Sequence, residues 1–400
     1  MLHIVSLLLC MGVAFVPAAG QSAGPASEIT NPVVHALCGK SVALLGESPV
    51  HGFGKTIEFK VELVRRLIDE CHFNALFIES GIYDSINIQK KLKSGQDVSD
   101  SMISAAIGGL WATKEVQPLV PFLREKMKAG SLTFGGLDDQ IERGTYAQHQ
   151  MPSDLVQYLQ GDERSRCLAI FQKHMLWQYP DDAPYSPSDK TRMIGCLDRI
   201  ESRISQPEQS KASWAEADKA MIASLKRNLA RDFVENDFTK SDQELRWIND
   251  RERSMYLNFQ WLRSRLPSHS KVIVWAATVH LAKALSGVNG FENRVPFGSY
   301  IRQDFGDRAF TLGFSAYAGD YEFIRPPVHE LSTAPGNSLE ARSFANHDSA
   351  AVYLSLKQLR KFGSVEARPL GSDFKIAQWD QIVDALVVFR RERAPVWLPR

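Results

Sequence analysis

The hydrophobic pattern of the chain alternates between short apolar runs and amphipathic stretches. The run SVALLG at 41–46 is apolar and ends in glycine, which is typical of a buried strand. Residues 56–71 instead repeat apolar side chains every three or four positions, so they predict an amphipathic helix. A second apolar run, ALFIES at 75–80, follows this helix. The order strand, helix, strand predicts a βαβ unit and therefore parallel pairing.

More apolar runs of strand character follow along the chain. They lie at 132–138, 272–278, 309–314 and 384–389, and helical stretches such as 114–127 separate them. We therefore predict an α/β fold with a mostly parallel sheet flanked by helices.

The middle of the chain has a different pattern. From 140 to 267 the sequence is charged and helical without a strand signal, and a Pro/Asp/Ser-rich loop interrupts it. We predict a large all-helical insertion at 140–267 in an α/β core formed by 30–139 and 268–400.

The first 24 residues are predicted to be a signal peptide. An apolar run from Ile4 to Val16 is followed by proline and small residues. The chain is therefore expected to be secreted or periplasmic, where disulfides can form. Sequence alone does not determine their connectivity, but Cys167 and Cys196 lie in one helical region and are the favoured pair.

The net charge of the chain does not favour a strongly charged partner. The chain of 400 residues has 47 Lys and Arg against 46 Asp and Glu, a formal net charge of +1. A near-neutral balance offers no electrostatic basis for nucleic-acid binding or for an anionic membrane. We expect neither partner, and no stable membrane association once the signal peptide is removed.

Ionisable side chains collect where the predicted strands end, the edge at which parallel sheets bind ligands. Burying such groups is unfavourable unless they are paired or used. A neutral imidazole can take a proton from water while a carboxylate fixes its tautomer, which suits water-mediated hydrolysis of an ester. The same residues could instead hold a divalent metal. They are Glu47, His51, Glu79, Asp138 and His280.

The segment GFGKT at 52–56 allows a nucleotide-binding alternative. Its Gly54-Lys55-Thr56 resembles the end of a phosphate-binding loop, but Pro49 stands where the first glycine belongs. A covalent serine mechanism has less support, because GFSAY at 313–317 lacks the second glycine of a nucleophile elbow.

An ordered set of motifs resembles the erythromycin esterase family. The set covers about three quarters of the chain without the signal peptide. Its pieces are LLGESPVHG with Glu58 in the next helix, LFIES with Glu79, WATKEV with Trp111, GLD with Asp138, RERSMYLNFQWL with Arg251, and KVIVWAATVH with His280.

The resemblance implies a hydrolytic α/β core and metal-independent cleavage of an ester or lactone of a small or medium-sized molecule, without a cofactor. His51 would be the general base, Glu79 would orient the water or the imidazole, and His280 would stabilise charge. With Glu47 these form the predicted catalytic set. The predicted substrate-binding set is Asp138, Arg251, Glu58 and Trp111.

One departure from the family pattern affects the catalytic loop. Three residues separate Glu47 from His51, where the family has two. The extra residue leaves open an alternative in which Glu47 swings out of the site. That alternative favours a degenerate ligand-binding protein, which stands beside a metal-dependent hydrolase that uses the same Glu/His cluster as a rival hypothesis.

Overall fold

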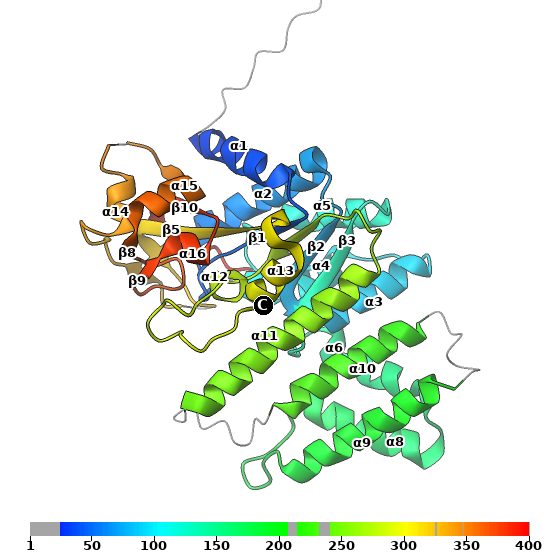
Figure 1. The fold of residues 1–400 in the computed structure, drawn as a ribbon. Coiled ribbons are helices and arrows are strands. Elements are labelled where there is room, and N and C mark those ends of the chain that lie inside the picture. Colours follow the sequence, from blue (N-terminus) through cyan, green and yellow to red (C-terminus); the bar gives the residue numbers. More distant parts are fainter. Residues whose placement is uncertain (1–24, 207–213, 232–240, 325, 347, 400) are drawn as a thin grey trace, which may run out of the picture.

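The computed structural model describes residues 25–206, 214–231, 241–324, 326–346 and 348–399. Its main element is an eight-stranded sheet in the order β3-β2-β4-β1-β5-β10-β7, with β6 paired to β5 (Figure 1). Neighbours from β3 to β10 are parallel, whereas β7 and β6 pair antiparallel. The strands are β1 (Val42–Leu45), β2 (Ala75–Gly81), β3 (Thr133–Asp138), β4 (Val272–Trp275), β5 (Ala309–Tyr321), β6 (His329–Leu331), β7 (Ala351–Ser355) and β10 (Ala385–Glu392).

Helices cover both faces of this sheet, which confirms the predicted α/β fold. In β1, Ala43 and Leu45 join one apolar cluster, whereas Val42 and Leu44 join the other. The first cluster includes side chains of α1 (Pro25–Cys38), α2 (Gly54–Cys71), α4 (Asp100–Ile107) and α5 (Leu119–Lys128). The second includes side chains of α11 (Ser241–Ser264) and α13 (Phe297–Phe305).

The described residues between β3 and β4 form helices and no strand. Most of these helices share an apolar cluster of their own, which α3 (Ile82–Lys93) joins through Ile82, Tyr83 and Ile86. Figure 1 shows α8, α9 and α10 lying beside one another, away from the sheet. The helices are α6 (Tyr146–His149), α7 (Met151–Leu155), α8 (Gly161–Met175), α9 (Pro187–Ile204) and α10 (Ala215–Ala230).

The position of α11 bears on the predicted domain boundaries. This helix falls inside the predicted insertion, yet its Met255, Phe259 and Leu262 pack in the cluster that covers the sheet. The division of the chain into core and insertion therefore stays a prediction.

Several predicted element bounds were wrong. The apolar run at 272–278 is β4 only to Trp275, and a short helix α12 (Thr278–Leu281) already starts at Thr278. In the predicted helix at 114–127, α5 begins only at Leu119. Small C-terminal elements were not predicted: α14 (Leu339–Ser343), α15 (Leu356–Phe362), the separate hairpin β8 (Ser364–Ala367) and β9 (Lys375–Gln378), and α16 (Trp379–Ile382).

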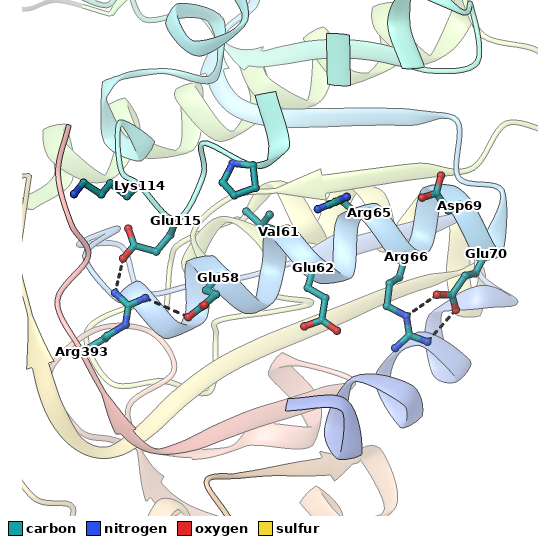
Figure 2. A pocket seen from close by; sticks show the side chains of 11 residues that line it. Glu58, Val61, Glu62, Arg65, Arg66, Asp69, Glu70, Lys114, Glu115 and Arg393 are labelled. Carbon is teal, nitrogen blue, oxygen red and sulfur yellow. Dashed lines mark hydrogen bonds and ion pairs between the residues drawn. The ribbon is translucent and has the colours of Figure 1, made fainter. Parts of the chain in front are cut away.

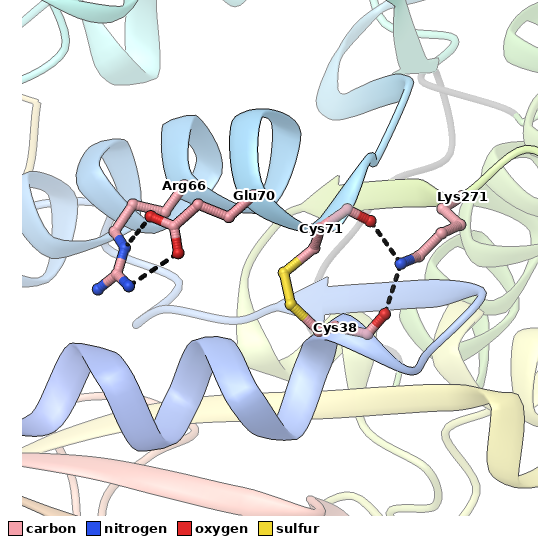
Figure 3. The surroundings of a disulfide bond; sticks show 5 residues. All are labelled: Cys38, Arg66, Glu70, Cys71 and Lys271. Carbon is pink, nitrogen blue, oxygen red and sulfur yellow. Dashed lines mark hydrogen bonds and ion pairs between the residues drawn. A yellow bond between two sulfur atoms is a disulfide. The ribbon is translucent and has the colours of Figure 1, made fainter.

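Two disulfides occur in the described residues. Cys167 and Cys196 join α8 to α9, which confirms the pairing expected from sequence. Cys38 and Cys71 join the C-terminal ends of α1 and α2. Figure 3 shows Lys271 donating hydrogen bonds to the backbone oxygens of both Cys38 and Cys71.

The predicted signal peptide, residues 1–24, lies outside the described residues. In the part of the chain that the structure describes, no helix combines the length and apolar character that crossing a membrane requires.

Candidate active site

The loop after β1 brings Glu47 and His51 into contact. The backbone N–H of His51 donates to the Ser48 oxygen at 2.9 Å, which closes a tight turn. His51 has a φ of 51°, in the left-handed region, so the turn accommodates the additional residue. Its Nδ1 lies 2.8 Å from Oε1 of Glu47. The alternative in which the extra residue swings Glu47 away from His51 is therefore wrong.

Glu47 is a buried carboxylate with several partners. Its Oε1 accepts from the indole N–H groups of Trp111 at 2.7 Å and Trp275 at 3.3 Å, and its Oε2 lies 3.1 Å from the Lys60 ammonium. Burial by itself raises the pKa of Glu47, but Lys60 and His51 outweigh it and hold the pKa below its usual range. Glu47 is therefore ionised at neutral pH.

Sequence analysis missed Lys60, the cation of this cluster. The side chain extends from α2 and is completely buried, with its ammonium 4.3 Å from the centre of the Trp275 ring. Burial lowers the pKa of Lys60 to about 8, against the opposing attraction of Glu47. Its spacing from Ile57 and Val64 places a lysine in the apolar stripe of the helix, and this was the signal available in the sequence.

The contacts of His51 determine its tautomer. An ionised Glu47 can only accept, so Nδ1 of His51 carries a hydrogen, and in the neutral ring the lone pair is on Nε2. Among the described residues, Nε2 has no hydrogen-bond partner. The ring packs edge-on against Trp111, with centroids 5.0 Å apart. The geometry thus fixes the imidazole and leaves its basic nitrogen free.

His280 forms a second centre, in α12 just beyond β4. Its Nδ1 lies 2.5 Å from Oε1 of Glu252, and its Nε2 lies 3.1 Å from Oε1 of Glu79. Burial opposes a charged ring, but the two carboxylates outweigh it and raise the pKa of His280 to about 9. His280 is therefore an imidazolium at neutral pH, with both ring nitrogens donating. Sequence analysis did not single out Glu252 and missed this contact.

Arg251 links the ends of β2 and β3. Its Nη2 lies 3.0 Å from Oε1 of Glu79, and its Nε lies 3.1 Å from Oδ2 of Asp138. The other oxygen of Glu79 accepts from the backbone N–H of Ala277 at 2.9 Å. Burial raises the pKa of Glu79, but the nearby His280 cation, His51 and Arg251 bring it well below its ordinary value. Glu79 is therefore ionised and lies between both histidine centres.

A cavity of about 1380 Å³ opens beside the ion pairs of Arg251. Glu79, Asp138 and Arg251 line its polar side. A smaller cavity of about 190 Å³ is lined by Arg251 and His280. The lining of the larger cavity also contains polar and charged side chains, such as Gln140, Glu142 and Arg143. Its apolar members include Leu110, Ile324, Pro326, Pro395, Val396, Trp397 and Pro399.

His51 lies next to the larger cavity and is not one of its lining residues. The backbone of Gly52, its neighbour, packs against Glu322, which does line the cavity. A Cβ at position 52 would stand 1.9 Å from the Glu322 oxygen, so only glycine fits here. This contact fixes the loop from Glu47 to His51 against the cavity wall.

Most predicted site residues come together, but Glu58 does not. Figure 2 shows Glu58 paired with Arg393, which also binds Glu115, in a groove along the outer side of α2. The Glu58 side chain is 67% exposed. Trp111 lies in the cluster, but it is buried against Glu47 and does not line the cavity.

The N-terminus of α2 argues against the nucleotide-binding alternative. The backbone N–H groups of Lys55 and Thr56 donate to the Glu392 carboxylate, each at 3.0 Å, and the Thr56 hydroxyl donates to it as well. These are the groups that would bind phosphate in a nucleotide loop. An internal carboxylate occupies this position instead.

The arrangement also bears on metal binding. Across the described ranges, His, Cys, Asp and Glu side chains do not gather in groups of three or more that could hold an ion. Both nitrogens of His280 donate to carboxylates, so this histidine has no lone pair to offer at neutral pH.

Comparisons with known proteins agree with the fold and indicate a family. The erythromycin esterase family model matches residues 68–391. The chain is 22% identical over 334 residues to "Putative hydrolase YbfO" of Bacillus subtilis (strain 168), covering 76% of this chain and 72% of that protein.

Solved structures share the fold at low identity. A Bacillus cereus protein has a TM-score of 0.69 at 16% identity and covers 94% of both chains. A succinoglycan biosynthesis protein has a TM-score of 0.68 at 14% identity, covering 95% of this chain and 100% of that one. A mutant of the erythromycin esterase EreC in its open conformation has a TM-score of 0.61 at 13% identity, covering 92% and 93%.

Proposed function

Because the chain belongs to the erythromycin esterase family, a family of hydrolases, we propose that it cleaves an ester or lactone by direct attack of water, with His51 as the general base. The observation that carries this proposal is the contact between Nδ1 of His51 and Glu47, which leaves Nε2 with a free lone pair. A general base needs a basic nitrogen held in place and able to reach a water molecule.

The base step uses the residues of the first centre. His51 Nε2 takes a proton from water as the water oxygen attacks the acyl carbon. The positive charge that forms on the ring is stabilised by Glu47, 2.8 Å from Nδ1. Lys60 and the two indole groups keep Glu47 ionised and fixed, so they position the base without contacting the substrate.

The second centre supports the developing negative charge. Arg251 lines the cavity, and its Nη1 lies 3.3 Å from Nε2 of His280. A neutral His280 could accept from Nη1, but a protonated ring has no lone pair for it, so Nη1 is then available to donate to a substrate oxyanion. Asp138 and Glu79 hold the guanidinium in this position.

The walls of the cavity indicate a substrate class. The polar side near Arg251 suits a carbonyl group, while Ile324, Val396 and Trp397 suit a hydrocarbon portion. A volume of about 1380 Å³ leaves room for a medium-sized molecule. We propose an ester or lactone with a substantial apolar body.

The test is detection of water addition by mass spectrometry. The protein without residues 1–24 and its His51→Ala variant are incubated with macrolide lactones and with aryl and alkyl esters, in the presence of a chelator. We expect addition by the wild type alone. Equal hydrolysis by a folded His51→Ala variant would contradict the role of His51, and activity only after metal addition would replace this mechanism with a metal-dependent one.

We also propose that the chain works in an oxidising compartment, secreted or in the periplasm. The disulfides Cys38–Cys71 and Cys167–Cys196 support this proposal, because stable disulfides are rare in a reducing cytosol. Thiol labelling of protein isolated from its native host checks it: both pairs should be unreactive until a reductant is added.

A further inference from the structure

We propose that Glu142 is a further catalytic residue, the general acid that protonates the leaving oxygen of the substrate. This inference rests on the proposed hydrolysis of an ester or lactone. Neither the sequence motifs nor the resemblance indicated this residue.

The position of Glu142 places it in the substrate cavity. It lies in the loop after β3, four residues beyond Asp138, and lines the same cavity as Asp138, Glu79 and Arg251. Its Oε2 accepts from the backbone N–H of Gly109 at 2.8 Å. The carboxyl group is therefore held at the polar side of the cavity, within the reach of a bound substrate.

Gly108 shapes the other side of this carboxyl group. Its φ is 101°, and a Cβ there would stand 2.7 Å and 2.8 Å from the two oxygens of Glu142. A side chain at position 108 would displace the carboxyl group and strain the backbone. The segment at 108–109 thus forms a cradle in which only the Gly109 N–H contacts Glu142 by hydrogen bond.

The charges that face Glu142 favour its protonated form. Asp138 and Asp84 lie near it, as does Glu79, whereas Arg251 is engaged by Glu79 and Asp138. Arg143, the next residue in the chain, is exposed. Within the ranges that the structure describes, Glu142 forms no ion pair.

These surroundings shift the pKa of Glu142. Burial is the largest cause and raises the pKa, and the nearby carboxylates raise it further. The hydrogen bond from Gly109 acts in the opposite direction, and the resulting pKa of Glu142 is about 7.

Glu142 and Glu79 therefore have opposite roles on one cavity wall. Glu79 stays ionised beside His280 and Arg251, whereas Glu142 holds a proton in the same pH range. Two carboxyl groups whose environments separate their pKa values are the usual arrangement for an acid and a fixed anion in one site.

In the proposed hydrolysis, His51 accepts one proton and Glu142 donates one. Water forms a bond to the acyl carbon and gives one proton to Nε2 of His51. The tetrahedral intermediate then breaks the bond between the acyl carbon and the leaving oxygen, and that oxygen takes the proton of Glu142. The products are a carboxylic acid and an alcohol, one water is consumed, and proton transfer from His51 to Glu142 through solvent restores both residues.

The substrates for the test differ in how much they need an acid. An alkoxide is a poor leaving group and requires a proton, whereas a nitrophenolate leaves without one. We expect Glu142→Gln, which keeps an acceptor for the Gly109 N–H, to lower kcat for an alkyl ester by about 100-fold or more. For the nitrophenyl ester of the same acid, the change should stay within about threefold, since only attack by water remains difficult.

The pH profile provides a readout that a purely structural role would not change. For the alkyl ester, the wild-type rate should fall as pH rises through about 7, because Glu142 loses its proton. This alkaline limb should be absent for the nitrophenyl ester. The exposed Glu125→Gln on α5 is the matched control and should behave as the wild type with both esters.

The rates of Glu142→Gln with the two esters distinguish a general acid from its alternatives. An equal loss with both esters in a folded Glu142→Gln variant would overturn the proposal in favour of a structural role. No loss with either ester would overturn it in favour of His51 as both base and acid. A wild type that hydrolyses neither ester, nor any member of the wider panel, would instead contradict the proposed function itself.

Discussion

His51 contacts one carboxylate, that of Glu47, whereas His280 lies between two, those of Glu79 and Glu252. Both histidines are buried at the C-terminal edge of the same sheet. The single contact leaves His51 one nitrogen with a lone pair, suited to accept a proton. The two contacts of His280 leave both of its ring nitrogens as donors to carboxylates. The number of carboxylates around each buried histidine thus distinguishes the proposed base, His51, from the fixed cation, His280.

Removing His280 is expected to have the largest effect on stability. His280→Gln leaves Glu79 and Glu252 buried with less positive charge, so the free energy of unfolding should fall by about 3–5 kcal/mol. His51→Gln removes one hydrogen bond from Glu47, which still has Lys60 as a partner. The free energy of unfolding should therefore fall by only about 1–3 kcal/mol. Urea unfolding at pH 7 measures both. Equal losses would contradict the comparison.

The pH dependence of this stabilisation has a definite sign. The pKa of His280 is raised from 6.5 to about 9 in the folded chain. Its contribution is therefore complete below pH 6.5 and is lost as pH rises through about 9, by about 3 kcal/mol. The difference in unfolding free energy between the wild type and His280→Gln should shrink over this interval. A constant difference would show that His280 is not protonated in the fold.

Lys60 should respond in the opposite direction. Burial lowers the pKa of Lys60 from 10.5 to about 8, so the unfolded chain binds the proton more tightly between these values. Stability relative to Lys60→Met should therefore rise as pH increases from about 8 to 10.5, by about 1–3 kcal/mol. Urea unfolding of both proteins across this range is the measurement. A falling difference would contradict the assignment of Lys60 as a desolvated cation.

Glu58 should show the smallest effect. Among the described residues, its exposed side chain forms an ion pair with Arg393, and it lies outside the cavity. We expect Glu58→Gln to change the free energy of unfolding by no more than about 0.5 kcal/mol and to leave hydrolysis unchanged. A clear loss of kcat/KM, measured on the same esters, would restore the substrate-binding role that the resemblance implied.

Residues that follow strands could be found from the sequence, because parallel strands bring their C-terminal ends to one edge. This geometry accounts for Glu47, His51, Glu79 and Asp138. Arg251 came only from the motif, since a position in the middle of a helix does not reveal which strand ends it faces.

The missed residues depend on three-dimensional packing. Lys60 was hidden because helical periodicity alone does not show that a lysine in the apolar stripe meets a buried carboxylate. Glu252 is adjacent to Arg251 in α11, but its partner His280 lies 28 residues away in the chain. Glu142 lies in a loop, where no periodic pattern applies, and its surroundings come from β2, α3, β3 and the segment at 108–109.

The Cys38–Cys71 disulfide has a consequence for cleavage of the chain. The covalent ring that it closes contains β1, the loop from Glu47 to His51, and Lys60 on α2. A protease that nicks this loop would therefore leave both fragments joined until a reductant separates them. The ring ties the proposed base, His51, and the Glu47–Lys60 ion pair to one covalent unit, while Arg251 and His280 come from elsewhere in the chain.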